Sequence, residues 1–101
     1  MAAPLHLDID SRGDGTIVLT ATGEIDLSNI AVFTEALNAA ARECDGASLV
    51  VDLRGVEYLD SGAINVLFAH ADRIHVIANP ILMPVLRISG LADVGSVEAA
   101  S

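Results

Sequence analysis

The chain has 101 residues, 52% hydrophobic but only 3% aromatic, with 14 acidic residues against 5 basic ones and a net charge of −9. This length predicts one domain with a single core of aliphatic side chains. The acidic balance argues against partners that need clustered Lys and Arg, namely nucleic acid and anionic membrane surfaces. A basic protein partner is favoured instead, mostly through its association rate.

The single cysteine and the opening residues predict a cytoplasmic protein. Cys44 cannot form an internal disulfide, which suits a reducing compartment, and we expect it to be a packing residue. The opening residues, MAAPLHLDID, contain neither a basic segment nor a long apolar stretch, so they do not resemble a signal peptide. No apolar run approaches the about 20 residues that span a bilayer.

Two strands are predicted before the first helix. Apolar and polar side chains alternate over residues 5–10, and residues 16–22 are rich in β-branched side chains, so both segments indicate strands. The Gly- and Asp-rich turn at residues 12–15 joins them as a hairpin. Ser28 is the expected N-cap of a helix whose apolar side chains recur at helical spacing from Ile30 to Cys44, and Asp45–Gly46 is expected to end it.

The middle of the chain predicts a buried strand followed by a helix. Residues 49–53 form a short apolar run typical of a buried strand, which we expect to break at Arg54–Gly55 before resuming over residues 56–59. A helix begins at Asp60–Ser61, because apolar side chains follow there at i, i+3, i+4 and i+7. Its unpaired backbone N–H groups carry partial positive charge at that end.

The last part of the chain adds another strand and helix. Residues 73–78 alternate as a strand, and Asn79–Pro80 starts a helix that ends at Ser89–Gly90. Pro84 removes a helical hydrogen bond, so this helix is kinked or begins later than Pro80. Residues 91–97 are expected to return to the sheet.

This order of elements predicts an α/β fold. Strand–helix–strand units close right-handed and pair in parallel, and the opening hairpin adds an antiparallel pair. We therefore expect a mixed four- to five-stranded sheet with helices mainly on one face. A single domain spans residues 1–101, with its core in about residues 5–95.

Asp60 and Ser61 are the main candidates for function. A structural cap is the common role of such a pair before an apolar helix. Gly62 removes bulk beside Ser61, and one of the two polar residues can cap the helix while the other faces outward. The chain lacks a G-x-S-x-G elbow, a nucleotide-binding glycine loop and a set of metal ligands. We expect no catalytic residue, cofactor or metal, although a small serine-dependent hydrolase or ligand-binding domain using Ser61 stays an alternative.

Three motifs resemble one family. The stretch VVDLRGVEYLDSGAINVL, residues 50–67, resembles the signature of the STAS domain found in bacterial anti-sigma factor antagonists. TGEID at residues 22–26 resembles the family's T-G-E-[IL]-D, and SGL at residues 89–91 resembles its S-G-L. The resemblance implies a single STAS-like domain that binds and is modified but is not an enzyme.

The resemblance also implies a phosphorylation switch. Ser61 matches the serine phosphorylated by a cognate anti-sigma factor that is also a protein kinase. The unphosphorylated domain binds that kinase and releases a sigma factor, and phosphorylation ends the binding. The acidic charge already argues against a nucleic acid or membrane partner, and a weak homodimer stays open as a further partner. The expected partner-binding residues are Glu24, Asp26, Asp60, Ser61, Gly62 and Asn65.

One departure from the family pattern supports an alternative. A hydroxyl residue often occupies the position of Gly62, and the family's glycine usually occupies that of Ala63. The alternative function is a STAS-like adaptor that binds another regulator without being phosphorylated.

Overall fold

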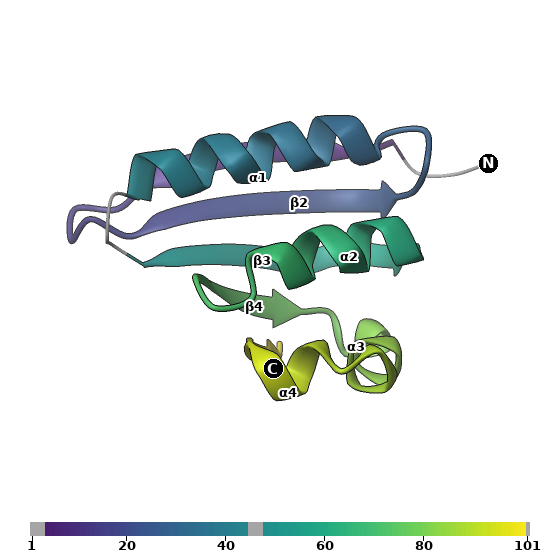
Figure 1. Ribbon diagram of the computed structural model, residues 1–101. Helices are drawn as coiled ribbons and strands as arrows, with labels where there is room; N and C mark the ends of the chain where they lie inside the picture. The colour runs from purple at the N-terminus through teal and green to yellow at the C-terminus, as the bar shows by residue number, and fades with distance from the viewer. Residues whose placement is uncertain (1–3, 45–47, 101) are drawn as a thin grey trace.

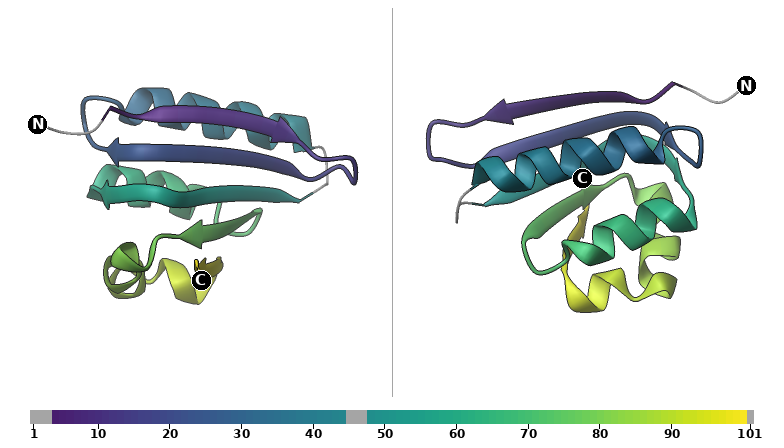
Figure 2. Two further views of the ribbon diagram at one scale, coloured as in Figure 1. Left: turned by 180° about the vertical axis from the view of Figure 1, so that it is seen from behind. Right: turned by 45° about the horizontal axis from the view of Figure 1, so that its top comes forward.

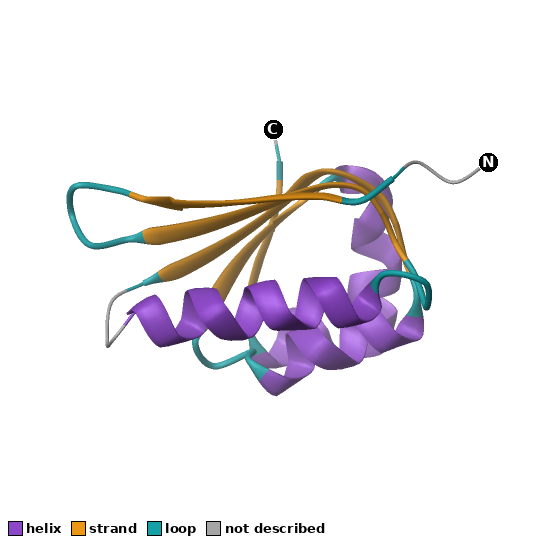
Figure 3. Ribbon diagram, turned by 90° about the horizontal axis from the view of Figure 1, so that it is seen from above, coloured by secondary structure: helices purple, strands orange, loops and turns teal. Residues whose placement is uncertain are grey.

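The computed structural model describes residues 4–44 and 48–100, which form a five-stranded sheet with its helices on one side (Figures 1 and 3). None of the helices in this part of the chain is long and apolar enough to span a membrane. In chain order the elements are β1 (His6–Ser11), β2 (Ile17–Ile25), α1 (Ile30–Cys44), β3 (Leu49–Leu59), α2 (Ser61–Ala69), β4 (Ile74–Ala78), the 3₁₀ turn η1 (Pro80–Leu82), α3 (Met83–Ser89), α4 (Leu91–Val94) and β5 (Ser96–Ala99).

The sheet order follows the chain order, β1-β2-β3-β4-β5. β1 pairs antiparallel with β2, whereas the pairs β2–β3, β3–β4 and β4–β5 are all parallel. The prediction of an α/β fold with a mixed sheet and helices mainly on one face is therefore confirmed. Figure 2 shows from behind that the strands face outward while α1 and α2 lie beyond them.

The core lies between the sheet and this helical layer. Phe33 and Leu37 of α1 and Leu67 of α2 are fully buried, as are Leu19 of β2 and Val51 of β3. Leu49, Val51 and Leu53 alternate toward the core at the start of β3, and the parallel register of β3 with β2 shifts between Thr20 and Thr22 and again between Gly23 and Glu24. This register sets where the two strands end, and both lead into the candidate site.

The expected break at Arg54–Gly55 is wrong, because β3 runs without interruption from Leu49 to Leu59. Gly55 lies opposite Thr22 of β2, and a Cβ atom on Gly55 would lie 2.6 Å from the Thr22 Cγ2 methyl. The glycine therefore permits a close approach of two strands rather than ending one. The register shift between Thr20 and Thr22 lies beside it.

The region after β4 agrees with the expectation from Pro84. The Asn79 side chain accepts a hydrogen bond from the Ile81 N–H at 3.1 Å and caps η1. α3 begins later, at Met83, so Pro84 falls in its first turn, where no helical N–H is needed. α3 ends at Ser89, and Gly90 has a φ of 88°, the left-handed conformation that favours glycine at this position. The return to the sheet is shorter than expected, because α4 intervenes before β5.

Candidate functional site

The candidate site lies where β2 and β3 end, on the edge of the sheet formed by the carboxyl ends of the parallel strands (Figure 1). The Asp60 N–H donates to the Ile25 carbonyl at 3.2 Å, which ties the end of β3 to the end of β2. A Cβ atom on Gly62 would lie 3.8 Å from Ile30 at the start of α1. The loop of residues 26–29 and the start of α2 are therefore neighbours.

Asp60 is the N-cap of α2. Its backbone is extended, with φ −87° and ψ 177°, and its Oδ1 accepts a hydrogen bond from the Ala63 N–H at 3.0 Å. Its carbonyl accepts the Ile64 N–H at 3.2 Å, the first bond of the helical ladder. From the local sequence, either Asp60 or Ser61 could cap this helix, and the structure shows that Asp60 does so.

Ser61 is the first residue of α2, and its side chain is exposed. Within residues 4–44 and 48–100, no hydrogen-bond partner is found for its hydroxyl. The nine-residue α2 directs the positive end of its dipole toward this position. The site therefore presents an accessible alcohol beside backbone groups that favour negative charge, while phosphorylation of Ser61 stays a prediction.

The loop before α1 holds a charged carboxylate near this serine. Asp26 accepts hydrogen bonds from the hydroxyl and the N–H of Ser28, and these bonds hold the pKa of the Asp26 carboxyl below its ordinary value. The Asp26 N–H donates to Asn29 Oδ1, and Asn29 Nδ2 donates to the Glu24 carbonyl, each at 2.9 Å. The expected N-cap role of Ser28 is wrong, because its hydroxyl is used by Asp26 and α1 begins at Ile30.

The predicted partner-binding residues occupy one region, with differing exposure. Asp26, Asp60 and Gly62 are half-buried, whereas Ser61 is exposed. Asn65 is exposed one helical turn after Ser61, on the same side of α2. Glu24 is half-buried in β2, opposite Tyr58 of β3. Their binding of a partner stays a prediction.

Sequence reasoning missed the apolar residues at this edge. Leu27 is 83% exposed between Asp26 and Ser28, and Tyr58 is 48% exposed near the end of β3. Ile81, 65% exposed, follows β4 at the same edge of the sheet. Leu27 carried a signal, since it is a lone aliphatic residue in a polar loop, but only the structure shows that it points away from the core.

The described residues offer little for catalysis at Ser61. His70 contacts the Asn38 side chain and the Val66 carbonyl, and His75 contacts Ser96 and Glu98, so the hydrogen bonds of these two histidines do not involve Ser61. In the part of the chain that the structure describes, no group of three potential metal ligands is found. Cys44 is buried, and burial raises the pKa of its thiol, which fits a packing residue.

A family model described as "Mlab, STAS domain" matches residues 10–97 of this chain. No curated protein sequence gives a significant match. Solved structures give strong matches. An anti-sigma factor antagonist from Mycobacterium paratuberculosis is 25% identical, with a TM-score of 0.82 over 96% of this chain and 89% of that one.

Two further similar structures are forms of the protein SpoIIAA. The anti-sigma factor antagonist SpoIIAA in its unphosphorylated form is 16% identical, with a TM-score of 0.72 over 95% of this chain and 89% of that one. The Bacillus cell fate determinant SpoIIAA in its phosphorylated form is 20% identical, with a TM-score of 0.59 over 95% of this chain and 92% of that one. At these identities the two structures support the fold.

Proposed function

Since this chain belongs to the STAS domain family, we propose that it is an anti-sigma factor antagonist, switched off by phosphorylation at Ser61. In its unphosphorylated form it binds an anti-sigma factor that is also a protein kinase, and a sigma factor is released. The observation that carries the proposal is the division of roles at the start of α2. Asp60 caps the helix, which leaves the exposed Ser61 hydroxyl free for a partner.

The chemistry of the switch is a phosphoryl transfer in which this chain is the substrate. The Ser61 Oγ attacks the γ-phosphorus of ATP in the partner kinase, the bond to ADP breaks, and the hydroxyl proton passes to a base of the kinase. Ser61 gains about 1.5 to 2 negative charges at neutral pH. The start of α2 stabilises this charge locally, so the fold is expected to persist.

The same charge is unfavourable once a partner covers it. Asp60 directly precedes Ser61, and Asp26, which hydrogen bonds keep ionised, lies in the loop next to the start of α2, in a chain of net charge −9. Desolvating a phosphate beside two carboxylates at an interface costs several kcal/mol, which corresponds to about a hundredfold or more in affinity. Phosphorylation thus ends binding without unfolding the domain.

The exposed apolar residues fit a protein partner at this edge. Leu27 at 83% exposure and Tyr58 at 48% can be buried by a partner surface, while Asn65 and Asp26 supply polar contacts around them. Burying a leucine side chain contributes about 1.5–3 kcal/mol. We expect Leu27→Asp to weaken binding about tenfold or more. Ile88→Asp, at a comparably exposed position on α3, is the matched control.

The test combines binding with phosphate mapping. The wild-type protein and the variants Ser61→Ala and Ser61→Glu are incubated with candidate anti-sigma factor kinases and ATP. We expect mass spectrometry to place phosphate on Ser61, binding to persist for Ser61→Ala, and binding to be lost for Ser61→Glu. Equal binding of all three proteins would refute the switch.

A second candidate is the STAS-like adaptor that binds another regulator without phosphorylation. Gly62 favours it, because the family often carries a hydroxyl residue at this position, and Ala63 behind it is fully buried. This function predicts a captured regulator and no phosphate on Ser61 after incubation with ATP and kinase. The serine hydrolase alternative gains no support from the hydrogen-bond partners of His70 and His75.

A further inference from the structure

β1 forms one edge of the sheet and presents backbone groups that no described strand pairs with. The strand order begins with β1, and its neighbour in the sheet is β2. Figure 2 shows β1 along the rim of the sheet, beside α1. An exposed edge is a template for pairing with another strand, and proteins commonly block it with Lys, Pro or a bulge. β1 contains neither residue type, and its register with β2 is regular, so this edge is open to a partner strand.

The hydrogen bonds of the hairpin show which backbone groups of β1 face outward. The Arg12 N–H donates to the Thr16 carbonyl at 2.8 Å, so these residues form a hydrogen-bonded pair. Such pairs alternate along an antiparallel ladder, which places the next ones at Asp10 and Asp8. The N–H and C=O groups of the residues between them therefore point away from β2, and these residues are Leu7, Ile9 and Ser11.

Ile9 adds an exposed apolar side chain to this edge. Its cross-strand neighbour Leu19 is fully buried under the helices, so Ile9 points to the helical side of the sheet. α1 packs mainly over β2, however, and Ile9 remains 40% exposed. Val32 of α1 is 57% exposed and lies about 200° around the helix from Ile30, which faces α2. Apolar surface therefore remains along the helical side of β1.

The other side of β1 carries two carboxylates. Asp8 and Asp10 are exposed, and their cross-strand neighbours, Thr20 and Val18, are uncharged. Within the described residues, neither aspartate forms a salt bridge. A strand added to β1 would place alternate side chains directly beside these carboxylates, where opposite charges are favourable and like charges are unfavourable. The edge is therefore complementary to a strand with basic residues on this side.

We propose that β1 pairs with an extended basic segment of a protein partner. The backbone of that segment bonds to the outward N–H and C=O groups of β1. Its apolar side chains lie beside Ile9 and Val32, on the side of α1. Its Lys and Arg side chains alternate with them and lie beside Asp8 and Asp10. The six residues of β1 extend over about 20 Å, so a partner segment of about seven residues matches the edge.

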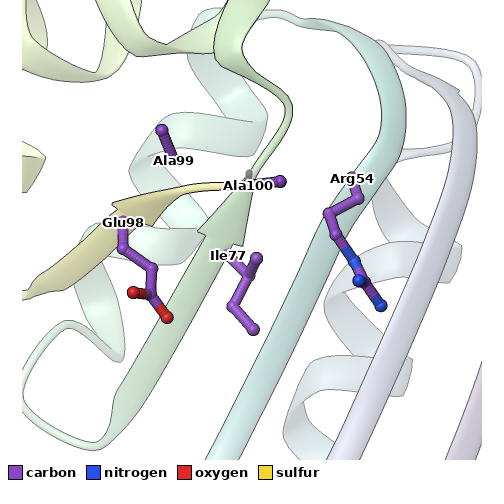
Figure 4. Close-up of a pocket in the computed structure, with 5 residues that line it drawn as sticks. All are labelled: Arg54, Ile77, Glu98, Ala99 and Ala100. Atoms are coloured by element: carbon purple, nitrogen blue, oxygen red, sulfur yellow. The ribbon is translucent and has the colours of Figure 1, made fainter.

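The opposite edge of the sheet is less suited to such pairing. β5 has only four residues, and its exposed polar side chains, Ser96 and Glu98, both contact His75. A hollow of about 310 Å³ lies beside β5, but its cation is already paired, because the Arg54 guanidinium donates to Asp52 Oδ2 at 2.7 Å. Figure 4 shows the residues that line it, which are Arg54, Ile77, Glu98, Ala99 and Ala100.

A second copy of this chain is a poor occupant of the β1 edge. Pairing two β1 strands would bring Asp8 and Asp10 of one copy near those of the other, and would join two chains of net charge −9. β2 also separates β1 from β3 and from the α2 start that follows it, so pairing at β1 does not require Ser61. The inference is therefore independent of the proposed function.

The test uses a labelled peptide of about seven residues in which Val and Lys alternate. The control peptide has the same composition with its Val and Lys residues in two blocks, so it cannot place them on opposite faces of a strand. Binding is followed by fluorescence anisotropy and by amide hydrogen exchange of the full chain. We expect the alternating peptide to bind at least about tenfold more tightly than the control. It should protect the amides of Leu7 and Ile9 and leave those of Asp8 and Asp10 unchanged.

Proline at position 9 tests the backbone pairing. Ile9→Pro deletes an N–H that does not bond to β2, and edge strands tolerate proline, so the fold should persist while peptide binding weakens about tenfold or more. The control Ile9→Val keeps this N–H and should bind within about twofold of wild type. If Ile9→Pro fails to fold, Ile9→Lys replaces it. This variant sets a positive charge beside the apolar side of the peptide and should also weaken binding about tenfold.

Charge reversal separates the β1 edge from overall charge. The double variant Asp8→Lys/Asp10→Lys should weaken peptide binding about tenfold and reduce its salt dependence. The double variant Glu35→Lys/Asp72→Lys makes the same change of charge at exposed positions on α1 and after α2. It should weaken binding by less than about threefold, because charges far from the edge are screened by salt.

Several outcomes would overturn the proposal. These are no binding of the alternating peptide, equal binding of the two peptides, unchanged binding to Ile9→Pro, or equal losses in the two double variants. A concentration-dependent dimer that protects the same amides would identify a second copy as the occupant instead. The Ser61→Glu variant should bind the peptide within about twofold of wild type, so failure of the switch at Ser61 leaves this result unchanged.

Discussion

Replacing Asp60 with alanine should loosen the start of α2 without removing the Ser61 hydroxyl. The substitution deletes the 3.0 Å hydrogen bond from the Ala63 N–H to Oδ1, whereas the backbone bond from the Asp60 N–H to the Ile25 carbonyl persists. Loss of such a cap costs about 1 kcal/mol, within a range of about 0.5–2. In a 101-residue domain this lowers Tm by about 4–8 °C.

Asparagine at the same position separates the hydrogen bond from the charge. The amide oxygen of Asp60→Asn can accept the Ala63 N–H, and Asn and Asp are about equal as N-caps. Only the interaction with the helix dipole is lost, so we expect Asp60→Asn to lose less than half the stability that Asp60→Ala loses. Urea unfolding of the three proteins measures both values, and equal destabilisation of the two variants would refute the cap.

Two further predictions concern the strands that lead to the site. Gly55→Ala should destabilise the domain by about 1–3 kcal/mol, since its Cβ would lie 2.6 Å from Thr22 Cγ2, and Thr22→Ser should recover at least half of that loss in urea unfolding. Identical stabilities of the single and double variants would contradict this account. The hydrogen bonds from Arg54 hold the pKa of Asp52 below its ordinary value, so its ionised form stabilises the fold above the unfolded-state pKa, and this contribution is lost as pH falls through the folded-state value. The stability difference between wild type and Asp52→Asn, about 1 kcal/mol at pH 7, should therefore shrink below about pH 4, and a pH-independent difference would exclude this pair as its source.

Hydrophobic periodicity predicted the helices and strands whose pattern is contained within their own residues. The buried side of the first helix was predicted, because four fully or largely buried side chains recur along one side of α1, although Ser28 is not its N-cap and its expected end at Asp45–Gly46 lies outside the described residues. The sequence misled at Arg54–Gly55, where a glycine after a charged residue is typical of a turn. The glycine at position 55 is explained by Thr22, 33 positions earlier, whose side chain occupies the space that a Cβ atom on residue 55 would need. No local pattern contains that contact.

The site shows the same limit on prediction. The adjacency of Asp60 and Ser61 indicated that one could cap α2 while the other faced outward, but which residue does so depends on the backbone at the end of β3. Ser28 was predicted as a cap because of its residue type, whereas Asp26 and Asn29 form the hydrogen bonds that order this loop. Leu27 could not be assigned to the surface from sequence, since a lone leucine before a helix equally suits a buried contact.

The separation of roles between Asp60 and Ser61 has a consequence for the proposed switch. Because α2 is capped by Asp60, a change of charge at Ser61 acts mainly on what binds there and little on the energy of folding. Affinity and stability should therefore vary independently among the Ser61 variants. A Ser61→Glu protein that lost partner binding together with more than about 1 kcal/mol of stability would show that the serine contributes to the fold, and its loss of binding would then be explained by unfolding of the α2 start.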